Sequence, residues 1–399
     1  MALKCRYSTL LIVFYFINMI VFSNGSVIAK VGKMIFAGMS LFYIIGVRKK
    51  KSNGWLQLEL WLIGYTLYAC LSYFWADSKV YALSGIKTIL LNSFCVYILI
   101  QLLQSNENWK NIVLKSVAIC PLFLFIRLFL QYGTIVFNGL RILGTGEHNS
   151  AGMYAAIGCF FSVYYILSNK CNNLKWYSIA ALDFMIVLLS MSRKAMIYLL
   201  VPVILCYLFT GKNISQRIKN FIGLLILVLF VWFAVMNVPV LYRYIGSGLE
   251  SVLNYFNGGA GDASAAGRNT RIVFGLAKFK QKPCFGWGAM NYNKLFGDFQ
   301  TGMDMVIADN NFIDILVNFG IVGFIVYYSI YARGVVNFVR LRYHDTLNEV
   351  MPFAFLMTLL VCDYGVSAYI YLYSQTFIAI ATGMILENRK MQKKGRKNA

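Results

Sequence analysis

The chain has 399 residues, of which 59% are hydrophobic and only 13% are charged. Soluble globular domains are roughly half apolar and a quarter charged, so this composition excludes a soluble enzyme and a disordered protein. The 37 Lys and Arg against 15 Asp and Glu give a net charge of +22. In a polytopic membrane protein such a surplus marks the loops that stay in the cytoplasm, so it does not indicate a nucleic-acid partner.

Apolar segments follow one another along most of the chain. Crossing a hydrocarbon core of about 30 Å takes roughly 20 mainly apolar residues. We place twelve spans, at 9–22, 27–47, 55–75, 80–103, 111–130, 150–167, 176–191, 195–210, 220–238, 311–331, 350–363 and 367–386. The first is interpreted as an uncleaved span, because no small-x-small cleavage site follows it. The pattern predicts an all-α polytopic membrane protein in which 1–399 form a single transmembrane domain.

Positive charges alternate between the predicted loops. The even-numbered loops and both ends of the chain carry Lys and Arg, whereas the short odd-numbered loops are nearly free of them. Positively charged loops remain in the cytoplasm. We therefore expect both termini inside, including a basic tail at 387–399, and a large extracytoplasmic loop at 239–310 between the ninth and tenth spans.

The second half of this large loop has a helical pattern. At about 100° per residue, Arg268, Arg271, Lys278 and Lys282 share one face. The adjacent face carries Ile272, Leu276 and Phe279. This predicts an amphipathic interfacial helix with a cationic stripe, which either rests on anionic headgroups or holds a substrate phosphate.

Charged residues within spans are costly and are functional candidates by default. Lys33 and Arg127 lie where a long side chain can reach the headgroups, which is the favoured interpretation. Asp183 and Asp363 are interpreted as buried structural carboxylates, with a place in a polar cavity as the alternative.

A short external turn joins the seventh and eighth spans through Ser192, Arg193 and Lys194. Positive charge on this side opposes the usual distribution, which favours an anionic ligand here. An arginine suits a diphosphate because it bonds two oxygens at once. The alternative is a solvated cation at the membrane surface.

Another external cluster precedes the sixth span. Arg141, Glu147, His148 and Asn149 supply a cation, a carboxylate, an imidazole and an amide. We predict that they bind substrate. For His148 the alternative is a simple hydrogen bond at the start of a helix.

Four external segments together resemble the O-antigen ligase and O-antigen polymerase superfamily of membrane glycosyltransferases. They are GTGEHNSAG at 144–152, SMSRKA at 190–195, a stretch from Gly267 and Arg268 through KPCFGWG at 282–288, and DNNFIDILVNFGIVG at 309–323. Their order, spacing and common membrane side make the combination specific. The resemblance covers roughly residues 140–330.

The resemblance implies an undecaprenyl-diphosphate-linked oligosaccharide as donor, used at the outer face of the bacterial cytoplasmic membrane. Arg193 and Arg268 match the arginines that bind the diphosphate in this family. Ligases carry a histidine where this chain has Asp309, and the carboxylate resembles polysaccharide polymerases instead. The implied partners are a lipid-linked acceptor, the lipid bilayer, and a chain-length regulator and flippase of the same pathway.

Transfer from a lipid diphosphate requires little acid catalysis, because a diphosphate leaves without a proton. It requires cations for the developing negative charge, supplied by Arg193, Arg268 and Arg271, and one base near the acceptor hydroxyl. Asp309 is the predicted base, with helix capping as its alternative role.

Glu147 and His148 compete with Asp309 as the base, and Asn310 is predicted to bind substrate. No metal or other cofactor is expected, because no metal-ligand spacing appears.

These features predict a polymerase for O-antigen, capsule or exopolysaccharide that moves a growing glycan onto the next lipid-linked repeat unit. The first alternative is a ligase that transfers the glycan to another surface acceptor. A transporter or flippase is the alternative from a different class, but it would favour two similar six-span halves over one large loop placed off centre.

Overall fold

The computed structural model describes residues 2–22, 26–45, 53–140, 147–169, 174–210, 214–238, 263–300, 307–341 and 346–397. Within these ranges every regular element is a helix and no strand occurs, as the composition predicts. Arg141 and residues 239–262 of the large loop lie outside the described residues.

The helices follow the predicted apolar segments in order. They are α1 (Ala2–Val21), α2 (Val27–Ile45), α3 (Asn53–Leu71), α4 (Lys79–Ser105), α5 (Trp109–Tyr132), the 3-10 helix η1 (Gly133–Asn138), α6 (Glu147–Asn169), α7 (Leu174–Ser190), α8 (Arg193–Phe209), α9 (Ile214–Asn237), α12 (Ala263–Gln281), α13 (Asn291–Phe299), α14 (Asn311–Val339), α15 (Leu347–Cys362) and α16 (Leu372–Lys397). Each predicted span overlaps one of α1–α9 or α14–α16, and α12 and α13 lie in the predicted external loop.

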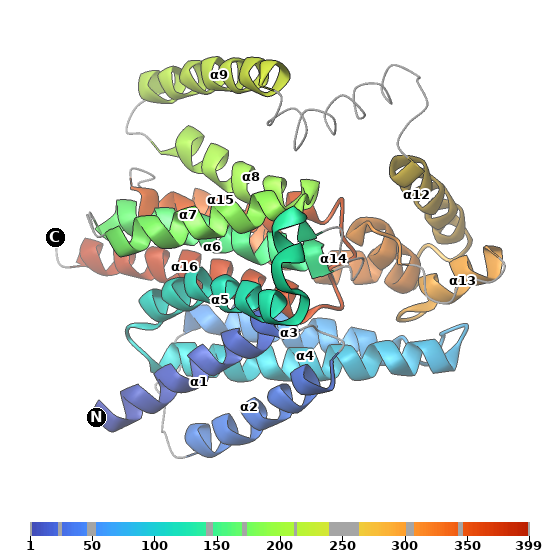
Figure 1. Ribbon diagram of the computed structural model, residues 1–399. Helices are drawn as coiled ribbons and strands as arrows, with labels where there is room; N and C mark the ends of the chain where they lie inside the picture. The colour runs from blue at the N-terminus through green and yellow to red at the C-terminus, as the bar shows by residue number, and fades with distance from the viewer. Residues whose placement is uncertain are drawn as a thin grey trace.

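The bundle has the termini at one end and the loop helices at the other. Both ends of the chain lie opposite α12 and α13 (Figure 1). Among the described residues, five helices are long and apolar enough to cross a membrane: Val27–Ile45, Lys79–Ser105, Trp109–Asn138, Glu147–Ser168 and Asn311–Val339. The chain is therefore a multi-pass membrane protein. The number of twelve spans and the side on which each end lies remain predictions.

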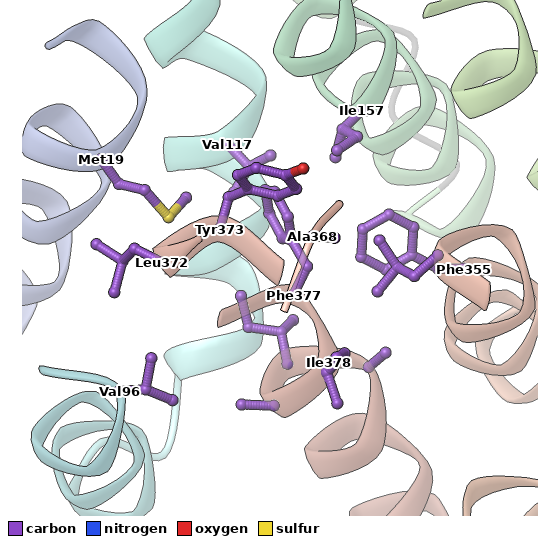
Figure 2. Close-up of a cluster of buried hydrophobic side chains, with 14 of the residues drawn as sticks. Met19, Val96, Val117, Ile157, Phe355, Ala368, Leu372, Tyr373, Phe377 and Ile378 are labelled. Atoms are coloured by element: carbon purple, nitrogen blue, oxygen red, sulfur yellow. The ribbon is translucent and has the colours of Figure 1, made fainter. Parts of the chain in front are cut away.

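The beginning of α16 occupies the centre of the main core. Leu372, Phe377 and Ile378 are at most 1% exposed. Figure 2 shows them surrounded by Met19 of α1, Val96 of α4, Val117 of α5, Ile157 of α6 and Phe355 of α15. This packing fixes the position of the segment that leads from α15 into α16.

A second, smaller core joins α12 and α13 to the start of α14. Tyr292, Phe296, Ala308, Ile313 and Val317 are buried in it, and Ile272 and Phe279 of α12 pack against them. Leu276, on the same predicted apolar face, is 41% exposed. α12 approaches α14 closely at Gly275, where a Cβ would lie 2.2 Å from Cγ2 of Ile313.

Two predicted surface-reaching cations are paired within the bundle instead. Lys33 is buried and its Nζ donates to Oδ1 of Asn92 at 2.9 Å. Arg127 donates to both carboxylate oxygens of Glu147, at 2.8 and 2.9 Å. A cation removed from water needs a hydrogen-bonding or oppositely charged partner, and each of these two has one.

Candidate active site

A cavity of about 330 Å³ collects residues from most of the predicted external segments. Its lining includes Arg127 of α5, Glu147, Asn149, Ser150, Met153 and Tyr154 of α6, Lys194 and Tyr198 of α8, Ile307 and Asp309 before α14, and Val366, Tyr371 and Tyr373 between α15 and α16. Pockets of this size are large enough to bind part of a small organic ligand. Polar and ionised groups meet aromatic rings in it.

Asp309 is the carboxylate at which the loop meets the bundle. It is ion-paired with Arg271 through Oδ2, and its Oδ1 lies 3.8 Å from Nζ of Lys194. Its φ of 53° lies in the left-handed region, which Asp and Asn tolerate better than other L-residues. The backbone therefore turns sharply here and directs the carboxylate toward two cations.

The capping role falls to the next residue. The side chain of Asn310 accepts a hydrogen bond from the backbone N–H of Ile313 at 3.1 Å, and Asn310 is the N-cap of α14. The interpretation of Asp309 as the cap was wrong. Asn310 is also a predicted substrate-binding residue, and its side chain is buried with its oxygen used by the helix.

The arginines of α12 differ in their exposure. Arg271 is partly buried in its ion pair with Asp309, whereas Arg268, one turn earlier, is exposed. Both arginines interact electrostatically with Lys194, so Arg268 lies near the same site. Lys278 and Lys282, at the far end of the predicted stripe, lie over the ring of Trp287 instead.

The backbone of Arg271 is also held in place. The Tyr292 hydroxyl donates to its carbonyl oxygen at 3.0 Å. Burial raises the pKa of Tyr292, so the phenol keeps its proton and remains a donor.

Lys194, rather than Arg193, lines the cavity, from the first turn of α8. Met191 has a φ of 49°, Ser192 is the N-cap residue, and α8 begins at Arg193, whose side chain is exposed. Lys194 lies one turn before Tyr198, which is buried and also lines the cavity. That four-residue spacing on the buried face of α8 is the signal in the sequence that could have identified Lys194.

Two residues of the predicted cluster at the start of α6, Glu147 and Asn149, line the cavity. Glu147 is paired with Arg127, and Oδ1 of Asn149 accepts a hydrogen bond from the Ser192 hydroxyl at 2.9 Å. That bond joins the start of α6 to the start of α8. His148 is not among the residues that line the cavity.

The asparagines after Asp309 organise the surrounding backbone. Oδ1 of Asn311 accepts from the backbone N–H groups of Ala368 and Tyr369, both at 2.8 Å. Its Nδ2 donates to Asp363 at 3.0 Å. Asn311 therefore fixes the segment between α15 and α16, and Asp363 has the structural role that was predicted for it.

The loop segment 282–288 packs against a break in α14 and forms backbone hydrogen bonds with it. Gly320 has φ 64° and ψ −169°, a conformation that interrupts the helix. The backbone N–H groups of Ile321 and Val322 donate to the carbonyl oxygens of Pro283 and Cys284, at 2.9 and 3.3 Å. The family-like motif at 309–323 thus connects the predicted external loop to the bundle.

The fold and the cavity define a helical membrane protein with a polar, partly cationic site adjoining α12. Residues 178–328 match the family described as O-antigen ligase, and the matched stretch contains Lys194, Arg271 and Asp309. This match confirms the predicted resemblance to the O-antigen ligase and polymerase superfamily. No curated protein matches the chain.

Proposed function

We propose that the protein is a polysaccharide polymerase that transfers an undecaprenyl-diphosphate-linked glycan onto a lipid-linked repeat unit at the outer face of the cytoplasmic membrane. The observation that carries this proposal is the carboxylate of Asp309, which lines the cavity together with Lys194 and is ion-paired with Arg271 of α12. Glycosyl transfer from a diphosphate needs a base and nearby cations, and this arrangement supplies both. The match of residues 178–328 to a family of membrane glycosyltransferase-like enzymes supports the same reaction class.

Asp309 accepts the proton of the acceptor hydroxyl as its oxygen attacks the anomeric carbon of the donor. The bond from that carbon to the phosphate oxygen breaks, and its electron pair leaves with the diphosphate. Lys194 and Arg271 stabilise the negative charge that develops on the leaving group. Arg268 and Arg193 extend the positive field toward solvent. Direct displacement of this kind inverts the anomeric carbon.

The ion pairs of Asp309 suggest how substrate activates the base. Without a donor, Lys194 and Arg271 are engaged by the carboxylate. A diphosphate carries more negative charge and more acceptor oxygens than one carboxylate, so it competes for both cations. Donor binding then frees the oxygens of Asp309 for the acceptor proton, and the base becomes available once the donor is in place.

A ligase that transfers the glycan to a different surface acceptor is the second candidate. The description of the matched family favours it. Asp309, at a position where ligases of the family carry histidine, favours the polymerase.

Deletion of the gene distinguishes these two activities. The polymerase proposal predicts that surface glycan stops at one repeat unit, seen by gel electrophoresis, and that the wild-type gene restores long chains. Accumulation of full-length glycan that is not attached to its acceptor would contradict polymerase activity and support the ligase. Surface glycan of normal length would contradict both.

A further inference from the structure

Tyrosines form one wall of the cavity. Tyr371 is partly exposed to it and stacks on Tyr373, with ring centroids 5.7 Å apart and planes inclined by 15°. Tyr154 of α6 meets Tyr373 edge to face, at 6.2 Å and 88°. Tyr373 is 6% exposed and Tyr154 is 3% exposed. The exposed ring of Tyr371 therefore has a rigid aromatic support behind it.

The position of this ring is fixed by the backbone around it. Tyr371 lies two residues after Tyr369, whose N–H group, like that of Ala368, donates to Asn311, and it directly precedes the buried Leu372. Figure 2 shows Tyr373 between Val117 of α5 and Ile157 of α6, with Leu372 beside it. A ring held in this way loses little conformational entropy when a ligand stacks on it.

The charges of the cavity divide it into two kinds of wall. On the side of α8 and Asp309, Lys194 lines the cavity and Arg271 of α12 pairs with Asp309, so two cations adjoin a single carboxylate and the net charge there is positive. On the wall formed by α5 and α6, Arg127 and Glu147 neutralise each other, and the amide of Asn149 adjoins them. A neutral set of donors and acceptors suits hydroxyl groups rather than a diphosphate.

A pyranose ring has an apolar C–H face and a rim of hydroxyl groups. The C–H face is attracted to the electron-rich face of an aromatic ring. Hydroxyl groups can exchange hydrogen bonds with a carboxylate, a guanidinium and an amide. The carboxylates of Asp314 and Asp309 interact electrostatically with Tyr371, so the ring lies near the proposed base.

We propose that Tyr371, supported by Tyr373 and Tyr154, is a sugar-stacking platform, and that Arg127, Glu147 and Asn149 bind hydroxyl groups of the same saccharide. This inference rests on the proposed function and assigns a part of the substrate to each wall. The diphosphate lies against Lys194 and Arg271, and a sugar next to the reacting bond lies against Tyr371. Tyr371 is thereby a residue that determines glycan specificity.

Two probes separate the walls in binding measurements on the full-length protein in detergent. One is the free repeat-unit oligosaccharide, released from its lipid carrier by mild acid, and the other is inorganic pyrophosphate. Tyr371→Leu should weaken oligosaccharide binding roughly tenfold and leave pyrophosphate binding within about twofold of wild type. Arg271→Ala should instead weaken pyrophosphate binding and leave oligosaccharide binding nearly unchanged.

Two further variants identify the ring as the binding element. Tyr371→Phe keeps the ring and should bind the oligosaccharide within about threefold of wild type. Tyr364→Ala is the matched control, because Tyr364 lies on the same segment, is 68% exposed and does not line the cavity. It should bind both probes normally.

Wild-type oligosaccharide binding by Tyr371→Leu would overturn the platform, and so would an equal loss in the Leu and Phe variants. Loss of both probes in Tyr371→Leu would make Tyr371 a structural residue, which also contradicts the proposal. Failure of pyrophosphate to bind the wild type would count against the proposed function, while the oligosaccharide measurements would still decide on Tyr371.

Discussion

The residue that decides between catalysis and scaffolding is Asp309. Asp309→Asn should keep the fold, because Asn adopts the same left-handed backbone and Asn310 remains the cap of α14. Transfer should fall by about 10²- to 10⁴-fold, since an amide cannot accept the acceptor proton. The measurement is the rate of glycan lengthening together with the melting temperature of the purified protein.

Asn310→Ala serves as the opposite control. It removes the side-chain acceptor of the cap and should cost about 1 kcal/mol of stability, while the carboxylate stays in place. A near-normal rate in Asp309→Asn would transfer the role of base to Glu147 or His148.

The two cations that contact Asp309 should matter more than those nearer solvent. Arg271→Ala and Lys194→Ala should each lower transfer by about 10²-fold, because each removes positive charge where the leaving diphosphate develops its own. Arg193→Ala should have a smaller effect than Lys194→Ala, because Arg193 is exposed and does not line the cavity. The rate of diphosphate release measures the effect of each of these three substitutions.

Lys280→Ala is the matched control on α12, since Lys280 is exposed and does not line the cavity. Equal losses in Arg193→Ala and Lys194→Ala would contradict the assignment of Lys194. Arg271→Lys should restore little activity, because lysine keeps the charge but loses the paired donors of the guanidinium.

The sequence predicted which residues belong to this site better than it predicted which of them pair with one another. Asp309, Glu147 and Asn149 stand out because they lie in family-like motifs that are predicted to share one membrane side. Arg127 was assigned to the headgroups, because its distance along the chain from Glu147 does not reveal that α5 and α6 pack together. Which charged side chains pair with one another depends on which helices pack together, and the hydrophobicity of the sequence does not specify that packing.

Among the elements, the break in α14 makes the sharpest prediction. Gly320→Ala should lower stability by at least about 2 kcal/mol, because an L-residue is strained at this backbone conformation and its Cβ would lie 2.2 Å from the carbonyl oxygen of Cys284. Thermal unfolding in detergent measures the change.

Gly64→Ala in α3 is the control, because nothing lies within 4 Å of the added Cβ. It should be neutral or slightly stabilising, since Ala favours a helix more than Gly. Equal stability of the two variants would contradict the role of Gly320 in receiving the loop.

Long apolar runs made the helices predictable, because each run must satisfy its backbone hydrogen bonds internally when it enters the membrane. The last predicted span began at 367, whereas α16 begins at Leu372. The difference arises because the N–H groups of Ala368 and Tyr369 bind the side chain of Asn311. A contact between residues so far apart in the chain leaves no periodic signal.

At the scale of the whole molecule, labelling of Cys284 can show on which side of the membrane the large loop lies. It is exposed on the loop that docks on α14, whereas Cys70, Cys95, Cys120, Cys159, Cys206 and Cys362 are buried or partly buried. A membrane-impermeant thiol reagent should label wild-type protein in intact spheroplasts and should not label Cys284→Ala. Labelling of wild type only after permeabilisation would place the loop in the cytoplasm and contradict the predicted orientation.

The cations around Asp309 also make a prediction about metal. In the proposed reaction Arg271, Lys194 and Arg268 neutralise the diphosphate without a divalent ion, so EDTA should not change the transfer rate of the purified protein. Loss of transfer that magnesium or manganese restores would instead assign the carboxylate of Asp309 to a metal.

The most direct test of the whole account is reconstituted transfer in lipid vesicles that contain undecaprenyl-diphosphate-linked repeat units and no nucleotide sugar. The wild-type protein should release one undecaprenyl diphosphate for each glycosidic bond formed, and Asp309→Asn should form neither product at a comparable rate. Wild-type protein that lengthens no glycan and releases no diphosphate, or an Asp309→Asn variant that does both at the wild-type rate, would contradict it.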